Sequence, residues 1–152
     1  MGSIPTLSVM RNVAVVGSRG WRPEGWSEHE DLSPFAVFEL LLMGMLKAGD
    51  TVLSGGARGP DTWAIVVARN LNHPTEVILA DWENLGKKAG MLRNTQVVER
   101  ADWVIAFWDG KSRGTRDTIG KAHKTGCRVT VIFPDGRIRE NWGDDADQAS
   151  VV

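Results

Sequence analysis

Several features that often reveal a protein's class are missing from this 152-residue chain. It has one cysteine, Cys127, so it forms no internal disulfide and holds no multi-cysteine metal site. The formal net charge is −1, which gives no bulk attraction to nucleic acid or to an anionic membrane. No apolar run reaches the roughly 18 residues that a membrane-spanning helix needs. We therefore expect a soluble, cytoplasmic protein in which any anion site is built from a few placed residues.

Two nucleotide-binding signatures are also absent. No GxGxxG motif follows the first expected strand, which argues against an NAD-type Rossmann site. The GxxxxGK[ST] motif of P-loop NTPases is missing too, because residues 110–115 lack its Lys-Ser/Thr ending. The three histidines (His29, His73 and His123) are scattered without the spacing of metal ligands, so we expect no metal site.

Short β-branched and apolar runs alternate with amphipathic segments along the chain. The runs predict five strands, each ending at a polar loop, at 12–16, 51–53, 76–80, 103–107 and 128–133. Apolar side chains at three- to four-residue spacing predict four helices between the strands. The first two helices are expected to begin at Pro34 and Pro60, and the others to span about 90–100 and 115–125.

Strands that read as continuous apolar runs are typical of a parallel sheet covered by helices on both faces. The expected fold is a Rossmann-like, three-layer α/β domain with a mostly parallel five-stranded sheet. We expect this single domain to span residues 12–136, between tails at 1–11 and 137–152. The C-terminal tail is polar and acidic.

Three loops at the expected strand ends share one composition. They are GSRGW at 17–21, SGGARGPD at 54–61 and DGKSRGTRD at 109–117, and each contains Gly, Ser and Arg. In an open parallel sheet, ligands bind beyond the carboxyl ends of the strands. Glycine allows close backbone approach, helix-start N–H groups and serine hydroxyls donate hydrogen bonds, and arginine matches phosphate oxygens. Turns alone require the glycines but not the recurrent Arg and Ser, so we expect a phosphate pocket.

Four ordered segments spread over residues 13–133 resemble a known superfamily. They are VAVVGSRGW, LSGGARGPDTWA, ADWENLGKKAGMLRN and VIAFWDGKSRGTRDTI. They are similar to the SLOG superfamily, in particular to its small YspA-like (DUF2493) branch. The superfamily has a Rossmann-like fold and includes the LOG cytokinin-activating phosphoribohydrolases, molybdenum-cofactor carrier proteins and DprA. The resemblance implies a nucleotide or nucleotide-derived ligand with no required cofactor. Together with the apolar segment at 35–46, it favours a homodimer or a higher homo-oligomer.

One LOG motif bears on catalysis. In LOG enzymes, a PGGxGTxxE segment holds the phosphate and supplies a catalytic glutamate. Here Gly114 and Thr115 match, but Thr118 stands in place of the glutamate, and Asp117 is one residue earlier, about 100° around a helix. Cleavage of an N-glycosidic bond needs a carboxylate beside the developing positive charge. Ligand binding of a sensor or carrier type is therefore the leading function.

Two alternatives remain open. The first is hydrolysis of a nucleoside monophosphate N-glycosidic bond, with Asp117 or Asp61 as the catalytic carboxylate. Asp61 is equally well explained as a residue that stabilises a helix N-terminus. The second is DprA-like binding of single-stranded DNA, which the net charge disfavours, so we do not expect a nucleic-acid partner.

The expected ligand site combines the three loops with the segment after the third strand. The resemblance places Arg93 and Asn94 over the pocket. The expected ligand-binding residues are Gly17, Ser18, Arg19, Ser54, Gly55, Gly56, Arg58, Asp61, Asp81, Trp82, Arg93, Asn94, Gly110, Ser112, Arg113, Gly114 and Thr115.

The seven tryptophans suggest an aromatic contact to a base. Trp82 follows the third strand at its carboxyl end, where it is placed to stack on a ligand. Trp21 and Trp108 flank phosphate-type loops and are further candidates for stacking. Trp63 and Trp103 are expected in the core.

Overall fold

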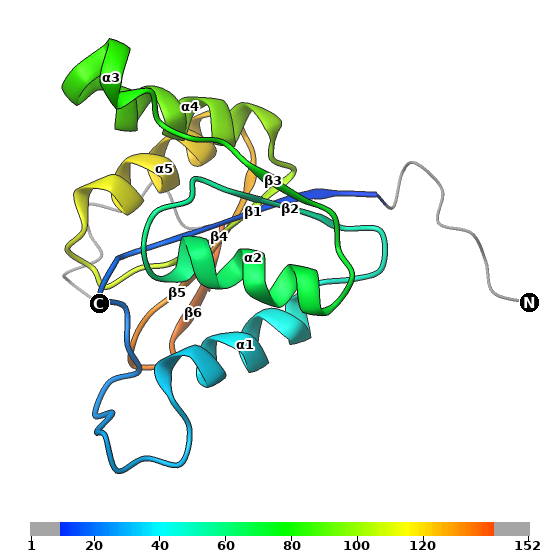
Figure 1. The fold of residues 1–152 in the computed structure, drawn as a ribbon, viewed down its shortest axis with the longest axis vertical. Coiled ribbons are helices and arrows are strands. Elements are labelled where there is room, and N and C mark those ends of the chain that lie inside the picture. The colour runs from blue at the N-terminus through cyan, green and yellow to red at the C-terminus, as the bar shows by residue number, and fades with distance from the viewer. Residues whose placement is uncertain (1–9, 142–152) are drawn as a thin grey trace, which may run out of the picture.

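A six-stranded sheet with helices on both sides organises the molecule (Figure 1). The computed structural model describes residues 10–141. The strands lie in the order β3-β2-β1-β4-β5-β6, and all neighbours are parallel except β5 and β6. Their bounds are β1 Asn12–Gly17, β2 Thr51–Ser54, β3 Thr75–Val77, β4 Trp103–Phe107, β5 Arg128–Ile132 and β6 Ile138–Glu140.

Five α-helices and one 3₁₀ turn connect the described strands. They are α1 Pro34–Met45, α2 Pro60–Asn70, α3 Trp82–Leu85, the turn η2 Gly86–Lys88, α4 Ala89–Arg100 and α5 Arg113–Lys124. The hydroxyl of Ser33 accepts the N–H of Ala36 at 3.1 Å, which caps α1 in the predicted way. Proline occupies the first position of both α1 and α2, where no intrahelical N–H is needed.

Both faces of the sheet are buried under helices, and the alternating side chains of β1 illustrate this. Val13 and Val15 lie in the hydrophobic cluster under α1 and α2, whereas Ala14 and Val16 lie in the cluster under α4 and α5. Successive side chains of a strand point to opposite faces, so both faces need apolar residues. Figure 1 shows α1 and α2 on one side of the sheet and α4 and α5 on the other. This three-layer arrangement confirms the predicted fold class.

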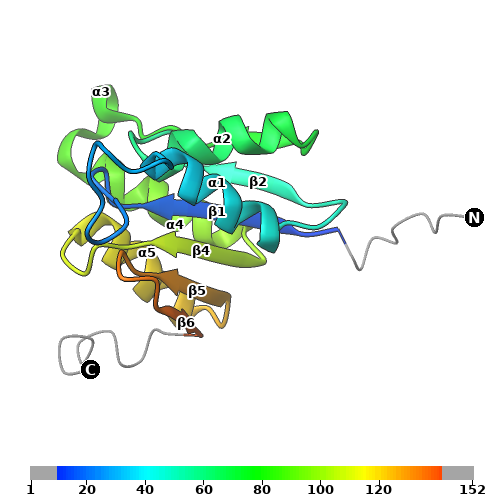
Figure 2. The same cartoon turned by 90° about the horizontal axis from the view of Figure 1, so that it is seen from below.

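The chain reverses its direction of travel across the sheet between β1 and β4. From β1 the chain crosses to β2 and β3, and from β4 it crosses the other way to β5 and β6. The β1–β4 ladder runs from Val13↔Trp103 to Gly17↔Phe107. Figure 2 shows the parallel strands pointing the same way, with the loops after β1 and β4 gathered at their carboxyl ends. This switch point is where open α/β sheets bind ligands.

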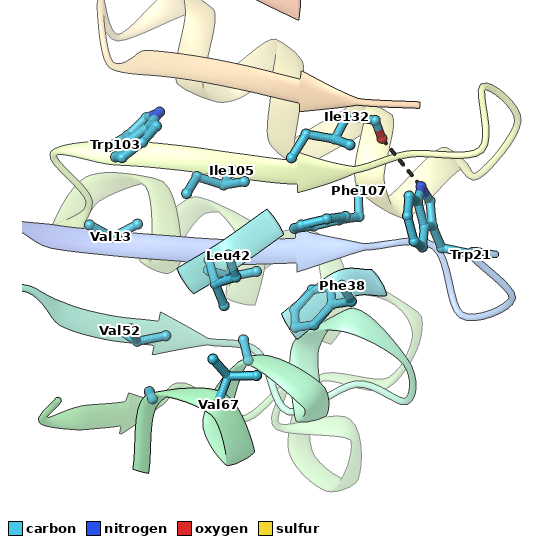
Figure 3. Close-up of a cluster of buried hydrophobic side chains, with 13 residues drawn as sticks. Val13, Trp21, Phe38, Leu42, Val52, Val67, Trp103, Ile105, Phe107 and Ile132 are labelled. Atoms are coloured by element: carbon cyan, nitrogen blue, oxygen red, sulfur yellow. Dashed lines mark hydrogen bonds between the residues drawn. The ribbon is translucent and has the colours of Figure 1, made fainter. Parts of the chain in front are cut away.

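Two tryptophans that we considered for ligand stacking are core residues instead. Trp21 is 2% exposed; its indole N–H donates to the carbonyl of Ile132 at 3.2 Å, and its ring meets Phe107 edge-on (Figure 3). Trp108 is also 2% exposed and donates to the carbonyl of Ser112. Both residues follow apolar strands, and burial of a large aromatic surface outweighs exposure to a ligand. The stacking prediction for both was wrong.

The two tryptophans predicted in the core do lie there. Trp103 is 4% exposed and donates its indole N–H to the hydroxyl of Thr130. Trp63 is partly buried and packs against Phe35 and Phe38. Both predictions are confirmed.

The sheet differs from the prediction at both edges. It has six strands rather than five, because Gly136, with a φ of 91°, turns the chain so that β6 pairs antiparallel with β5. β6 lies in the segment that we assigned to the C-terminal tail, whereas 142–152 fall outside the described residues. At the other edge, β3 ends at Val77, and Leu79 is 71% exposed where the chain leaves the sheet for α3. The connection after β3 contains α3 and η2.

Neither a membrane-spanning helix nor a cluster of metal ligands occurs within the described residues. Within 10–141, no helix combines the length and apolar character needed to cross a membrane. In that part of the chain, no three His, Cys, Asp or Glu side chains group as metal ligands. Cys127 is half-buried with its Sγ 3.5 Å from the carbonyl oxygen of Ala101, and burial raises the pKa of its thiol. It therefore acts as a packing residue.

Candidate functional site

A cleft of about 670 Å³ opens at the carboxyl ends of the central strands. Its walls come from the loops after β1, β2 and β4, from the segment spanning α3 to α4, and from the first turns of α5. The predicted site residues that line it are Gly17, Ser18, Arg19, Gly55, Asp61, Trp82, Arg93, Asn94, Ser112, Arg113, Gly114, Thr115 and Asp117. The structure thus brings Gly17 and Asp117, 100 positions apart in the chain, into one site.

Two predicted residues of the second loop support the cleft from behind rather than lining it. Ser54 is fully buried, and its hydroxyl donates to the main-chain oxygen of Asp61 at 2.8 Å. The same hydroxyl accepts the N–H of Gly56 at 3.1 Å. Ser54 and Gly56 therefore fix the shape of the loop and do not face a ligand.

Three other predicted residues also lie outside the cleft. Arg58 is exposed on the far part of the second loop. Asp81 is the N-cap of α3, and its carboxylate accepts the N–H of Asn84 at 3.3 Å. Gly110, with a φ of 82°, forms the turn after β4 and lines a second, smaller hollow of about 330 Å³. Sequence composition alone did not separate these positions from those that face the cleft.

Asp61, in the first turn of α2, joins the loops after β1 and β2. It is 5% exposed, and its Oδ1 accepts the N–H of Gly17 at 3.1 Å while its Oδ2 accepts the N–H of Gly55 at 3.2 Å. Two glycine amides that point toward the site are thus already bound to a protein carboxylate. A ligand phosphate cannot use them while Asp61 is in place.

The environment of Asp61 changes its acidity. Burial raises the pKa of Asp61 to about 6, from 3.8 for a solvated aspartate. The charge of Arg93 and the N–H groups of Gly17, Ala57 and Gly55 lower the pKa but do not cancel the effect of burial. Perturbed carboxyl groups in clefts are typical of functional sites.

The loop after β4 leads into a helix N-terminus with open donors. Asp109 accepts the N–H groups of Lys111 and Ser112, both at 2.8 Å, and orders the loop. Burial raises the pKa of Asp109, but these two N–H donors, together with the Ser18 side chain and the residue's own backbone, outweigh it and hold the pKa below its usual value. An α-helix leaves its first N–H groups without intrahelical acceptors. Among residues 10–141 no side chain caps α5 at Ser112, so the amides of Gly114 and Thr115 can donate to a ligand.

Arg93 and Asn94 connect α4 to two of the cleft's walls. The Nη1 of Arg93 donates to the carbonyl of Gly55 at 2.7 Å, and its Nε donates to the Oδ1 of Asn94 at 3.2 Å. The amide nitrogen of Asn94 donates to the Oδ2 of Asp117 at 3.0 Å and to the carbonyl of Gly114 at 3.3 Å. Asn94 thereby helps to position the first turn of α5 across the cleft from β2.

The two residues compared with the LOG glutamate are engaged with their neighbours. The Oδ2 of Asp117 accepts both Asn94 and the ammonium of Lys121, the latter at 2.8 Å. Thr118 is 2% exposed, and its hydroxyl donates to the carbonyl of Gly114 at 3.3 Å. A carboxylate is present on this wall, but it is held by an amide and a cation.

Trp82 comes to the cleft from α3, an element separate from the β-strand loops. It is 58% exposed, yet it lines the cleft together with Lys87 and Met91. Sequence reasoning missed these two neighbours because neither belongs to a glycine-rich loop at a strand end. It also missed Asp109, which begins the loop DGKSRGTRD. Lys87 and Met91 reach the cleft from η2 and α4.

Comparisons with known proteins give one relative and two structural neighbours. No protein-family model matches the chain. The chain is 38% identical over 137 residues to the gene 61 protein of Mycobacterium phage D29, covering 83% of this chain and 98% of the phage protein.

Two solved structures share the fold. DNA processing protein A (DprA) from Streptococcus pneumoniae matches with a TM-score of 0.62 and 21% identity, over 93% of this chain and 56% of DprA, so the chain spans little more than half of that protein. TM1055 matches with a TM-score of 0.59 and 25% identity, over 79% of this chain and 72% of TM1055. These neighbours support the Rossmann-like fold expected for the SLOG superfamily. The YspA-like branch stays a prediction.

Proposed function

The chain belongs to the same family as the gene 61 protein of Mycobacterium phage D29, and we propose that it binds a nucleotide or a nucleotide-derived phosphorylated ligand. The ligand lies in the cleft at the carboxyl edge of the sheet, and the protein acts as a sensor or carrier of the YspA-like type. No further cofactor is required for binding.

The uncapped N-terminus of α5 is the observation that carries this proposal. Gly114 and Thr115 line the cleft, and their amides lie where the helix dipole favours an anion. By contrast, the amides of Gly17 and Gly55 donate to Asp61. The phosphate therefore binds at α5, not across all three glycine-rich loops. One uncapped helix start suits a single phosphate group.

Basic side chains around the cleft supply the balancing charge. Arg19 and Arg113 are exposed and line the cleft on the loops after β1 and β4. Arg113 is the first residue of α5, next to the two open amides. A guanidinium matches phosphate oxygens in a bidentate fashion, so we assign Arg113 as the main charged phosphate ligand.

Hydrolysis of an N-glycosidic bond is the second candidate, because Asp117 and Asp61 both line the cleft. The contacts of these two carboxylates favour binding over catalysis. Asp117 is held by Asn94 and Lys121, and Asp61 is held by two loop amides. The ammonium of Lys121 offsets the negative charge that Asp117 would need to stabilise positive charge developing on the sugar.

Calorimetry with AMP, GMP and ribose 5-phosphate tests the proposal. Arg113→Ala should weaken binding of all three by roughly 10- to 100-fold, the effect of losing a charge-assisted hydrogen bond. Arg58→Ala is the matched control, because Arg58 is an exposed loop arginine that does not line the cleft. This variant should bind as the wild type does.

Three results would contradict the proposal. Wild-type protein that binds none of these compounds would remove both the binding and the hydrolytic functions. Release of free base from AMP or GMP, abolished in Asp117→Asn, would make the protein an enzyme. A salt-dependent shift with single-stranded DNA would instead support DNA binding, a third candidate that the net charge of −1 disfavours.

A further inference from the structure

We propose that Trp82 forms a stacking surface that selects the ligand's base by ring area, so that purines bind more tightly than pyrimidines while adenine and guanine bind alike. This inference rests on the proposed function, since it assigns the base end of the same nucleotide site. It concerns the part of the cleft that α3 supplies. The inferred ligand class is therefore purine nucleotides in general, rather than the nucleotide of one particular purine.

The placement of Trp82 is the first argument. Trp82 begins α3, is 58% exposed and nevertheless lines the cleft. Exposing a large aromatic side chain to water at a cleft wall is unfavourable, because its apolar surface stays hydrated. A base stacked on the ring would bury that surface. The other cleft-flanking tryptophans, Trp21 and Trp108, are 2% exposed and are not available for stacking.

The indole is held from one side by the backbone of α4. A Cβ placed on Gly90 would lie 3.1 Å from the Cη2 of Trp82 and 3.7 Å from its Cζ2, so the six-membered ring rests against Gly90. α3 itself is fixed by its cap, in which Asn84 donates to Asp81 through both its main-chain N–H and its side-chain amide. The ring therefore has one supported side at the cleft, and Met91, 59% exposed, adds apolar surface to the same cleft.

The polar groups beside Trp82 do not distinguish one purine from another. Lys87, five positions after Trp82, also lines the cleft, and its ammonium can donate to N7, an acceptor that adenine and guanine share. Asp81 and Asn84, which could pair with a base edge, are bound to each other and do not line the cleft. Discrimination therefore depends on stacking, which accepts any π-face and increases with ring area.

The test is calorimetry with AMP, GMP, CMP, UMP and ribose 5-phosphate on wild type, Trp82→Ala and Trp82→Phe. A stacked base contributes roughly 1–3 kcal/mol, so Trp82→Ala should weaken AMP and GMP by about 5- to 150-fold. It should leave ribose 5-phosphate unchanged. Trp82→Phe should retain part of the affinity. Trp26→Ala is the control, because Trp26 is a partly exposed tryptophan that does not line the cleft.

The expected result is an order AMP ≈ GMP > CMP ≈ UMP in the wild type that disappears in Trp82→Ala. Equal affinity of the wild type for purine and pyrimidine nucleotides would overturn the inference. So would an equal loss for AMP and ribose 5-phosphate in Trp82→Ala. If ribose 5-phosphate binds and the bases add nothing, this inference alone fails. If no phosphorylated compound binds, the proposed function fails with it.

Discussion

At the residue scale, Asp61 explains why loops of similar composition differ in the backbone N–H groups that they leave open to a ligand. All three glycine-rich loops have the composition of phosphate loops, but the amides of Gly17 and Gly55 donate to the Asp61 carboxylate. This internal anion fixes two loops against each other without a ligand. This arrangement buries a carboxylate that is only 5% exposed, which is unfavourable for its charged form. The raised pKa of Asp61 reflects this unfavourable burial.

Asp61 should make stability depend on pH. Its folded-state pKa of about 6 lies above the 3.8 of a solvated aspartate, so the folded chain holds the proton more tightly. The stabilisation is therefore complete below about pH 4 and is lost as the pH rises through about 6. Between these limits the wild type should lose on the order of 3 kcal/mol of unfolding free energy relative to Asp61→Asn. Urea unfolding of both proteins at several pH values measures this difference.

Subtracting the unfolding free energy of Asp61→Asn from that of the wild type cancels the contributions of the other titrating groups. Asp109 has its pKa lowered by N–H donors, so its contribution runs in the opposite direction, but it is present in both proteins. A stability difference that stays constant between about pH 4 and about pH 7 would show that Asp61 does not titrate in this window.

At the element scale, the end of β1 touches the start of α2 and the end of β4. Gly17 is the residue at this contact. A Cβ there would lie 2.6 Å from two side-chain carbons of Pro60 and 2.8 Å from the carbonyl oxygen of Phe107. No real Cβ makes such contacts, so the glycine is required because three elements approach closely, and not only because of its loop.

Gly17→Ala should therefore destabilise the protein by about 1–3 kcal/mol, as overpacking does in a rigid contact. Gly20→Ala is the matched control from the same loop, because a Cβ at Gly20 would meet nothing within 4 Å. It should change stability by less than about 0.5 kcal/mol. Thermal or urea unfolding of both variants makes the comparison. Equal stabilities would mean that α2 and β4 can move away from β1 at little cost.

The elements that could be predicted from sequence are those with local signals. β1, β4 and β5 read as apolar runs because both faces of the sheet are covered, and Ser33 with Pro34 marks the start of α1. β6 has three residues and depends on pairing with β5, so no periodic pattern reveals it. β3 ends early because the chain must leave the sheet edge to reach α3.

The candidate site was predictable in outline and not in detail. The motifs identified the loops, and most of the residues predicted from them line the cleft. Trp21 follows a phosphate-type loop, but its indole donates to Ile132, a contact across 111 positions of the chain. The pairing of Asp61 with Gly17 spans 44 positions. Contacts of this range depend on the assembled sheet, which local sequence does not encode.

At the scale of the whole molecule, the fold gathers chemically different groups around one cleft. The switch point between β1 and β4 brings the loop before α5 to the cleft, and α3 brings Trp82 to it. Under the proposed function, the phosphate of a single nucleotide binds at the start of α5 and its base stacks on Trp82. Homo-oligomerisation, predicted from the resemblance and the segment at 35–46, stays a prediction; Leu40 and Met43 on α1 are exposed apolar residues there.

The most direct test of the central claim is a titration followed by the backbone amide signals in a ¹H–¹⁵N NMR spectrum. Adding AMP or ribose 5-phosphate should shift the amides of Gly114 and Thr115 most strongly, because these open donors at the start of α5 receive the phosphate. The amides of Gly17 and Gly55 should shift little, because Asp61 occupies them. Large shifts at Gly17 and Gly55 with none at Gly114 and Thr115 would contradict the account.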